Sequence, residues 1–351
     1  MQVYGGKNII RKMVVSDKLR KALIYFRPLG AYWTAVDPQE PLVVSPGPEG
    51  RFPLRLFQRI EEGHYTSFDA EGLPVRVAPD GRRQFHNHST LCSYALANWE
   101  KYQLTGDKRF AEILVRTAGY FLRTGEILAD GTLLLWDEYR HTLSSIYQGE
   151  AMSVFVRAWQ YSRNDRFCEA AKGCVLPLTR KVGDGGVAQT FAANSAVWYE
   201  ERCWPPVRHI LNGMNYALWG LRDVALATGD PLAKELLDQG LDSVERSLPL
   251  YDTGYWSRYW VAEDSLNYVA SMMYHNLHIV QLTVLARQTG RKTFQTYADR
   301  FREYAGRFPN RMLAGLTLSC NKMVLGRELR NEANETVCHS TDRADEESCH
   351  P

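Results

Sequence analysis

The sequence predicts an all-α fold in which four helical hairpins close into an (α/α)4 toroid, preceded by a small β element. The first observation is a short polar turn that recurs four times and ends at Asp107, Asp165, Asp230 and Arg291, which are 58, 65 and 61 positions apart. The second is the helical spacing of apolar residues on both sides of each turn. Repeats of this length with two helices each are typical of stacked hairpins. Closure into a ring is expected because no polar capping repeat is evident.

Residues 1–85 are predicted to be an N-terminal arm and a small β cap. The first 22 residues carry scattered Lys and Arg, as a solvated arm would. Further on, Tyr65–Phe68 and Leu73–Val77 flank Asp69–Gly72, a pattern that favours a strand, a turn and a second strand. This segment is too short for a complete β sandwich.

Residues 86–310 are predicted to form the toroid. Three of the four turns contain a glycine, which can adopt the left-handed conformation that ends a helix: Gly106, Gly229 and Gly290. Three of them supply an aspartate that suits the N-cap of the next helix: Asp107, Asp165 and Asp230. The last segment, residues 328–351, is polar and acidic, so we expect a disordered tail.

Composition excludes several classes of protein. The chain has 351 residues and a net charge of +2, which argues against a nucleic-acid partner. The apolar stretch Leu23–Trp33 is interrupted by Arg27 and Pro28 and is too short to span a bilayer. No signal peptide is evident, so we expect a cytoplasmic protein without a membrane span. The seven cysteines show neither CxxC nor zinc spacing, which fits a reducing compartment and predicts no metal site or other cofactor. An oligomer is compatible with these features.

The connections between hairpins predict where a site forms. They cover roughly residues 127–145, 182–208 and 249–270, and all of them must lie at one end of the ring. Long loops on a rigid helical scaffold are common places for sites. The N-termini of the inner helices meet at the same end and attract carboxylates. Polar residues recur near those helix starts and are expected to face the opening, with simple capping as the alternative: His88, Gln148, Asn212 and His275.

Glu201 is the candidate base. It lies between Tyr199 and the Trp204-Pro-Pro segment, surroundings that remove water and raise the pKa of a carboxylic acid. Its neighbour Glu200 is expected to point elsewhere. In the next connection, Tyr259 and Tyr274 can donate protons, although a buried hydrogen-bonded aromatic is the alternative for each. Arg202 and Arg258 could hold a substrate carboxylate by a forked pair of hydrogen bonds.

These motifs together resemble the C-terminal catalytic domain of D-glucuronyl C5-epimerases. The resemblance covers about Asp69 to Arg307 and depends on the order and spacing of five pieces: Trp198–Glu201, Leu211–Gly213, Leu250–Gly254, Tyr259 and Tyr274–His275. It implies a helical toroid in which Glu201, Tyr259 and Tyr274 are catalytic and Asn212 belongs to the site. The family has a tyrosine where this chain has Arg202.

The resemblance implies conversion of D-glucuronate to L-iduronate within a glycan. Glu201 would remove the proton at C5, Tyr274 would reprotonate the opposite face, and Tyr259 would assist. The partner would be an anionic uronate-containing polysaccharide or oligosaccharide, such as heparosan in glycosaminoglycan biosynthesis. The residues leave three alternatives open. They are a polysaccharide lyase, an unsaturated-glucuronyl hydrolase and a non-catalytic glycan-binding protein.

Overall fold

The computed structural model describes residues 52–78, 81–262 and 268–325. Helices dominate this part of the chain and pair into four hairpins, as the sequence predicts. The pairs are α3 (His88–Thr105) with α4 (Lys108–Thr124), α5 (Ser145–Ser162) with α6 (Asp165–Gly173), α7 (Leu211–Thr228) with α8 (Pro231–Tyr251), and α9 (Met272–Thr289) with α10 (Lys292–Gly306).

The turns inside the hairpins form as expected at three places and differently at one. Gly106, Gly229 and Gly290 follow their helices with φ of 72°, 69° and 71°. In the second hairpin Arg163 takes this left-handed position, with φ of 58°. There the N-cap is Asn164, whose side chain accepts from the backbone N–H of Arg166, and the predicted cap Asp165 is the first helical residue. Asparagine caps a helix as well as aspartate does.

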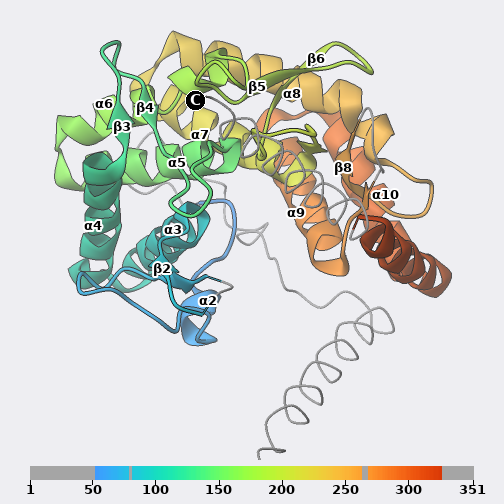
Figure 1. Ribbon diagram of the computed structural model, residues 1–351, viewed down its shortest axis with the longest axis horizontal. Helices are drawn as coiled ribbons and strands as arrows, with labels where there is room; N and C mark the ends of the chain where they lie inside the picture. The colour runs from blue at the N-terminus through green and yellow to red at the C-terminus, as the bar shows by residue number, and fades with distance from the viewer. Residues whose placement is uncertain (1–51, 79–80, 263–267, 326–351) are drawn as a thin grey trace, which may run out of the picture.

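The hairpins follow one another in an arc, from α3 and α4 at one side to α9 and α10 at the other (Figure 1). Contacts join α3 with α5, α5 with α7, and α7 with α9, so these four helices are the inner layer. Stacked hairpins are thus confirmed, whereas closure into a complete (α/α)4 ring stays a prediction. Helical structure also continues past the predicted boundary at 310, over 308–325.

Glycines bring α5 and α7 unusually close. A Cβ atom at Gly149 would lie 2.6 Å from the Cα atom of Ala217, and one at Gly220 would lie 2.2 Å from the carbonyl oxygen of Gly149. No side chain fits at these distances. The two backbones therefore pack directly on each other, and a side chain at either position would separate the helices.

Short antiparallel strands occupy the long connections. β3 (Glu126–Ile127) pairs with β4 (Leu133–Leu134), and β5 (Ala188–Phe191) with β6 (Ala196–Tyr199). β7 (His209–Ile210), β8 (Arg258–Val261) and β9 (Tyr268–Val269) form a sheet in that order, with Ile210 opposite Trp260. The last sheet joins the second connection to the third, so residues from both loops meet beside α7 and α9.

The N-terminal β element differs from the prediction. Between Tyr65 and Val77 the structure has one isolated bridge, Phe68 to Pro74, in place of a two-stranded hairpin. Instead β1 (Arg76–Val77) pairs with β2 (Gln84–Phe85), and a short helix α2 (Gln58–Glu61) precedes both. The Asp69 carboxylate accepts from two backbone N–H groups of its own turn, and backbone hydrogen bonds from Asp69 to Leu73 and from Val75 to Ser67 cross the turn.

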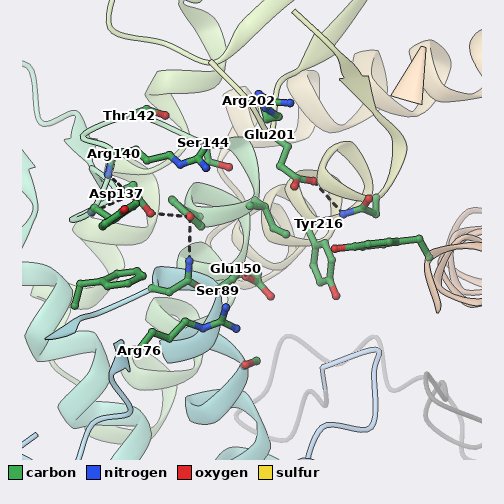
Figure 2. Close-up of a pocket in the computed structure, with 18 of the residues that line it drawn as sticks. Arg76, Ser89, Asp137, Arg140, Thr142, Ser144, Glu150, Glu201, Arg202 and Tyr216 are labelled. Atoms are coloured by element: carbon green, nitrogen blue, oxygen red, sulfur yellow. Dashed lines mark hydrogen bonds between the residues drawn. The ribbon is translucent and has the colours of Figure 1, made fainter. Parts of the chain in front are cut away.

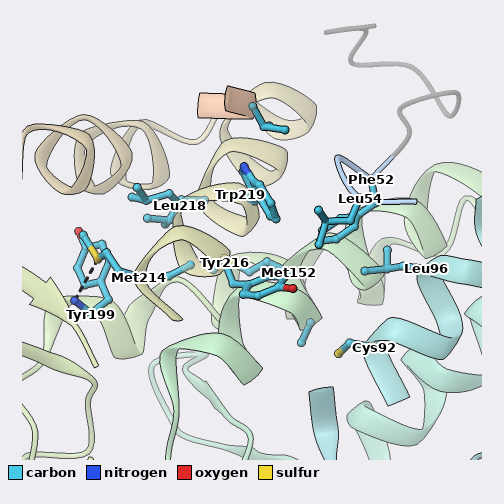
Figure 3. Close-up of a cluster of buried hydrophobic side chains, with 14 of the residues drawn as sticks. Phe52, Leu54, Cys92, Leu96, Met152, Tyr199, Met214, Tyr216, Leu218 and Trp219 are labelled. Atoms are coloured by element: carbon cyan, nitrogen blue, oxygen red, sulfur yellow. Dashed lines mark hydrogen bonds between the residues drawn. The ribbon is translucent and has the colours of Figure 1, made fainter. Parts of the chain in front are cut away.

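Residues 52–57 are part of the helical core. Phe52, Leu54 and Leu56 are buried, and the Phe52 ring packs edge-on against Trp219 of α7 at 5.6 Å (Figure 3). One carboxylate oxygen of buried Glu100, on α3, accepts from the backbone N–H groups of Leu56 and Phe57 at 2.9 and 3.1 Å. This segment thus spans the inner helices and is fixed by one carboxylate.

We predict that Glu100→Ala lowers the free energy of unfolding by about 2–4 kcal/mol, because it leaves two backbone donors without their acceptor. Denaturant unfolding followed by circular dichroism measures the change. Glu112→Ala, at an exposed position on α4, is the control and should change the stability by less than about 0.5 kcal/mol. Equal stability of the two variants would contradict the role given to Glu100.

Candidate functional site

A cavity of about 620 Å³ opens at one end of the inner helices. The first two turns of α3, α5, α7 and α9 line it, together with the connections around residues 137–144 and 201–204 and with residues of the N-terminal segment. Figure 2 shows side chains from all of these parts except α9 among its labelled residues, pointing toward one another. The cavity therefore lies where the helix N-termini and the long connections meet.

Glu201 lies at one corner of this cavity. In the chain it follows Glu200, which is the first residue after β6. The side-chain amide of Asn212, the second residue of α7, donates to the Glu201 carboxylate at 3.0 Å. A Cβ atom at Gly213 would lie 2.6 Å from the Cβ atom of Glu201 and 2.8 Å from its Oε2 atom. The Asn-Gly pair thus has a physical reason, because Asn212 orients the carboxylate and Gly213 makes room for it.

The surroundings of Glu201 raise the pKa of its carboxylic acid to about 7. Burial is the largest cause, and the charge of Glu200 adds to it. Hydrogen bonds from Asn212 and Tyr259 and the charge of Arg202 act in the opposite direction. A carboxylate with this pKa is a much stronger base than an ordinary glutamate and is still largely ionised just above neutral pH.

Glu200 points away from the cavity. Its side chain is fully buried and makes a hydrogen bond of 2.6 Å with Nδ1 of His209. Its carbonyl oxygen accepts from the backbone N–H of Ser145 at the start of α5. Neighbouring residues in extended backbone face opposite sides, so one carboxylate of the pair secures the loop and the other faces the cavity.

Tyr259 and Tyr274 complete this corner. Tyr274 is the third residue of α9 and lines the cavity, while Tyr259 comes from β8. Their ring centroids are 4.4 Å apart, and both Glu201 and Tyr274 influence the pKa of Tyr259. Burial and the charge of Glu201 raise the pKa of Tyr259 well above its usual value, so this phenol keeps its proton. The two rings form a continuous chain of phenols next to the carboxylate.

Two arginines meet at the same corner. Arg202 lies over the ring of Trp204 at 4.5 Å, and Arg140 lies over the same ring at 5.3 Å. Burial and the nearby charges of Arg208 and Arg140 lower the pKa of Arg202 to about 10, which leaves it charged at neutral pH. Two guanidinium groups held beside one indole form a cationic wall that suits a carboxylate.

Five residues predicted from the sequence for substrate binding do not line this cavity: His88, Gln148, Tyr199, Arg258 and His275. The guanidinium of Arg258 donates to the carbonyl oxygen of Leu250 at the end of α8. The hydroxyl of Tyr199, which is buried, donates to the carbonyl oxygen of Leu236 at 2.8 Å. Both side chains satisfy backbone groups inside the protein.

The other three are buried in helix packing. His275 stacks on Trp256 at 3.6 Å and bonds the Phe301 carbonyl through Nε2, and burial lowers its pKa to about 3. His88 packs edge-on against Phe121 and Tyr147, and burial lowers its pKa to about 4. Gln148 is fully buried, and its side-chain amide faces the backbone groups of Leu133 and Leu135. Packing thus accounts for these three polar residues.

The structure also adds residues that the sequence did not suggest. Glu150 and Tyr216 line the cavity from the second turns of α5 and α7. Tyr147 donates its hydroxyl hydrogen to Asp137 at 2.9 Å, and both line the wall next to Arg140. One signal was present in the sequence. Glu150 is the single acidic residue of α5, and the residues that follow it, Ala151 to Val156, are apolar apart from one serine.

The described residues do not meet the requirements of a membrane-spanning helix or of a metal site. None of their helices is at once long and apolar enough to cross a membrane. Nor do three or more His, Cys, Asp or Glu side chains come together anywhere in 52–78, 81–262 and 268–325 in a way that could hold a metal ion.

Comparison with known proteins matches residues 141–303 to the D-glucuronyl C5-epimerase C-terminus. The D-glucuronyl C5-epimerase of Caenorhabditis elegans is 28% identical over 248 residues, 66% of this chain and 37% of that protein. An uncharacterized protein of Methanocaldococcus jannaschii is 26% identical over 161 residues, 45% of this chain and 51% of that protein. The chain therefore spans between about a third and half of these relatives.

Among solved structures, cellobiose 2-epimerase from Bacillus thermoamylovorans superposes with a TM-score of 0.51 at 10% identity, covering 71% of this chain and 68% of that one. This likeness concerns the fold alone. The matched residues 141–303 contain Glu201, Asn212, Tyr259 and Tyr274, the corner of the cavity described above. Residues 141–303 of the chain are thus similar to the C-terminal domain of the D-glucuronyl C5-epimerases.

Proposed function

We propose that the protein is a uronyl C5-epimerase that converts D-glucuronate to L-iduronate residues in a glycan. The observation that supports it best is the Glu201 corner, where a carboxylate of raised pKa is oriented by Asn212 and lies beside Tyr259 and Tyr274. Epimerisation at C5 needs a base on one face of the sugar and an acid on the other. A glycan substrate with D-glucuronate, such as heparosan, is part of this proposal.

The reaction begins when the Glu201 carboxylate takes the proton from C5. The electron pair of the broken C–H bond moves into the substrate carboxylate, which becomes a dianionic aci-carboxylate. Arg202 and Arg140 stabilise this second charge, because their guanidinium groups are fixed next to Trp204 before the reaction starts. The proton that Glu201 gained makes it neutral, which its raised pKa favours.

The second step returns a proton to the opposite face of C5. Tyr274 lines the cavity and donates its phenolic proton to the carbanion, and the electron pair returns from the aci-carboxylate to form the new C–H bond. The ring of Tyr259 lies 4.4 Å from that of Tyr274, and its phenol senses the charge of Glu201, so Tyr259 can pass a proton from neutral Glu201 toward the phenolate of Tyr274. This transfer restores both catalytic groups without a cofactor.

Incubation of heparosan with the protein in deuterated water tests the proposal directly. We expect deuterium at C5, together with iduronate residues, when the product is examined by NMR. Unsaturated sugar ends that absorb ultraviolet light would identify a lyase, and release of unsaturated glucuronate from suitable oligosaccharides would identify a hydrolase. Binding of uronate polymers without any exchange would favour a non-catalytic glycan-binding protein.

We predict that Glu201→Gln lowers the rate of exchange at C5 by roughly 10²–10⁴-fold or more, because the amide cannot accept the proton. Its melting temperature should change little, since the amide can keep the contact with Asn212. The neighbouring change Glu200→Gln should behave in the opposite way. It weakens the buried contact with His209, so it should lower stability by about 1–3 kcal/mol and retain exchange. Normal exchange by folded Glu201→Gln would exclude Glu201 as the base.

We predict that Tyr274→Phe reduces inversion more strongly than exchange. Without the phenolic proton, the carbanion can be reprotonated only by Glu201, on the face from which the proton came. The ratio of iduronate formed to deuterium incorporated measures this effect. Tyr259→Phe is the matched control and should slow both processes together, because it disturbs Glu201 and Tyr274 alike. An unchanged ratio in Tyr274→Phe would remove Tyr274 from the second step.

A further inference from the structure

Glu150 is a carboxyl group in the cavity that the proposed mechanism does not use. It lies in the second turn of α5, with 4% of its surface exposed, and lines the same cavity as Glu201. The hydroxyl of Ser89, on α3, donates to its Oε2 atom (Figure 2). Ser89 is the hydrogen-bond partner that the described residues provide for this carboxyl group. This buried acid therefore faces the cavity.

The groups packed around Glu150 favour its neutral form. Burial is the main cause that raises its pKa to about 8, and the negative charge of Glu201 adds to it. The hydrogen bond from Ser89 and the charge of Arg59, on α2, act in the opposite direction. The other titratable groups that sense its charge are Tyr65 before α3, Cys92 on α3 and Tyr216 on α7, and burial raises the pKa of each.

We propose that Glu150 determines which glycans the cavity accepts: as a neutral acid it donates a hydrogen bond to a hydroxyl of the sugar beside Glu201, and as a carboxylate it repels an anionic sugar. This inference rests on the proposed function for its substrate class. Ser89 occupies Oε2, so the acidic proton is carried by the other oxygen. An isolated buried acid of this kind is a strong hydrogen-bond donor, because the alternative is an unpaired polar group.

The sign of the pH dependence follows from this placement. Below a pH of about 8 Glu150 is neutral and an anionic glycan binds, whereas above it the carboxylate adds a second negative charge near Glu201. The dissociation constant should then rise by about tenfold for each further pH unit. Catalysis requires Glu201 to be ionised, with a pKa of about 7, so the working range lies between these two ionisations. Since the charge of Glu201 raises the pKa of Glu150, the upper limit of this pH range depends on both carboxyl groups together.

The test compares wild type with Glu150→Gln, whose amide can donate a hydrogen bond but does not ionise. Calorimetry gives the dissociation constant of a heparosan tetrasaccharide from about pH 6 to about pH 9.5, a range that spans both ionisations. We expect equal affinity near neutral pH, a steep loss in wild type above pH of about 8, and little loss in Glu150→Gln. Ser89→Ala removes the bond that stabilises the carboxylate, so its loss of affinity should begin at higher pH than in wild type.

Each other outcome decides against the inference. The same alkaline loss in Glu150→Gln as in wild type would assign the titration to another group. Failure of a folded Glu150→Gln variant to bind near neutral pH would exclude a role that an uncharged donor can fill. If wild type does not bind the tetrasaccharide at any pH, the proposed function itself fails and the inference falls with it. Circular dichroism of each variant establishes that it is folded.

Discussion

The direct contact between the backbones of α5 and α7 is the constraint on which the site depends. It requires glycine at positions 149 and 220, and a Cβ atom at Gly149 would also meet the carbonyl oxygen of Tyr216 at 2.6 Å. The residue after Gly149 is Glu150, and Tyr216 lies one turn after Asn212. The spacing of these two helices therefore sets the width of the cavity floor and the separation of the groups that line it. The two neighbouring hairpins pack on this central pair.

The cavity brings acidic and basic side chains together where little water reaches them. Carboxyl groups of raised pKa lie in the same enclosure as guanidinium groups whose charges are partly desolvated. Neighbouring side chains hold these groups in place, such as Asn212 for Glu201 and Trp204 for Arg202. Such fixed polar groups need little reorganisation when charge develops in a substrate, which is the basis of electrostatic catalysis.

Much of the helical fold could be predicted because turn chemistry is local. Glycine at a helix end and a capping side chain before the next helix act over a few residues, so the four hairpins were evident. The Glu201 corner could be located for a similar reason, since the motif that contains it is continuous. Glu201, Arg202, Asn212 and Tyr274 all line the cavity that the structure shows.

The direction of side chains on the inner helices could not be predicted. His88, Gln148 and His275 lie within the first turns of their helices, as expected, but a rotation of about 100° per residue decides whether a side chain faces the cavity or a neighbouring helix. His275 faces Trp256 and Phe301, whereas Tyr274, one residue earlier, faces the cavity. The β element was predicted in part, because the bridge between Phe68 and Pro74 lies within the expected strand pattern, whereas the pairing of Val77 with Gln84 lies outside it.

The helix over 308–325 has a structural role that its position after the fourth hairpin does not suggest. The side chain of Asn321 accepts from the backbone N–H of Val269 in β9, and Thr317 makes a hydrogen bond with the hydroxyl of Tyr255 before β8. β8 contains Tyr259, and β9 leads within two residues to Ser271, which caps α9 at Tyr274. The helix over 308–325 thus supports the segments that hold Tyr259 and Tyr274. An expression boundary drawn at the last hairpin would remove this support while leaving every residue of the cavity in place.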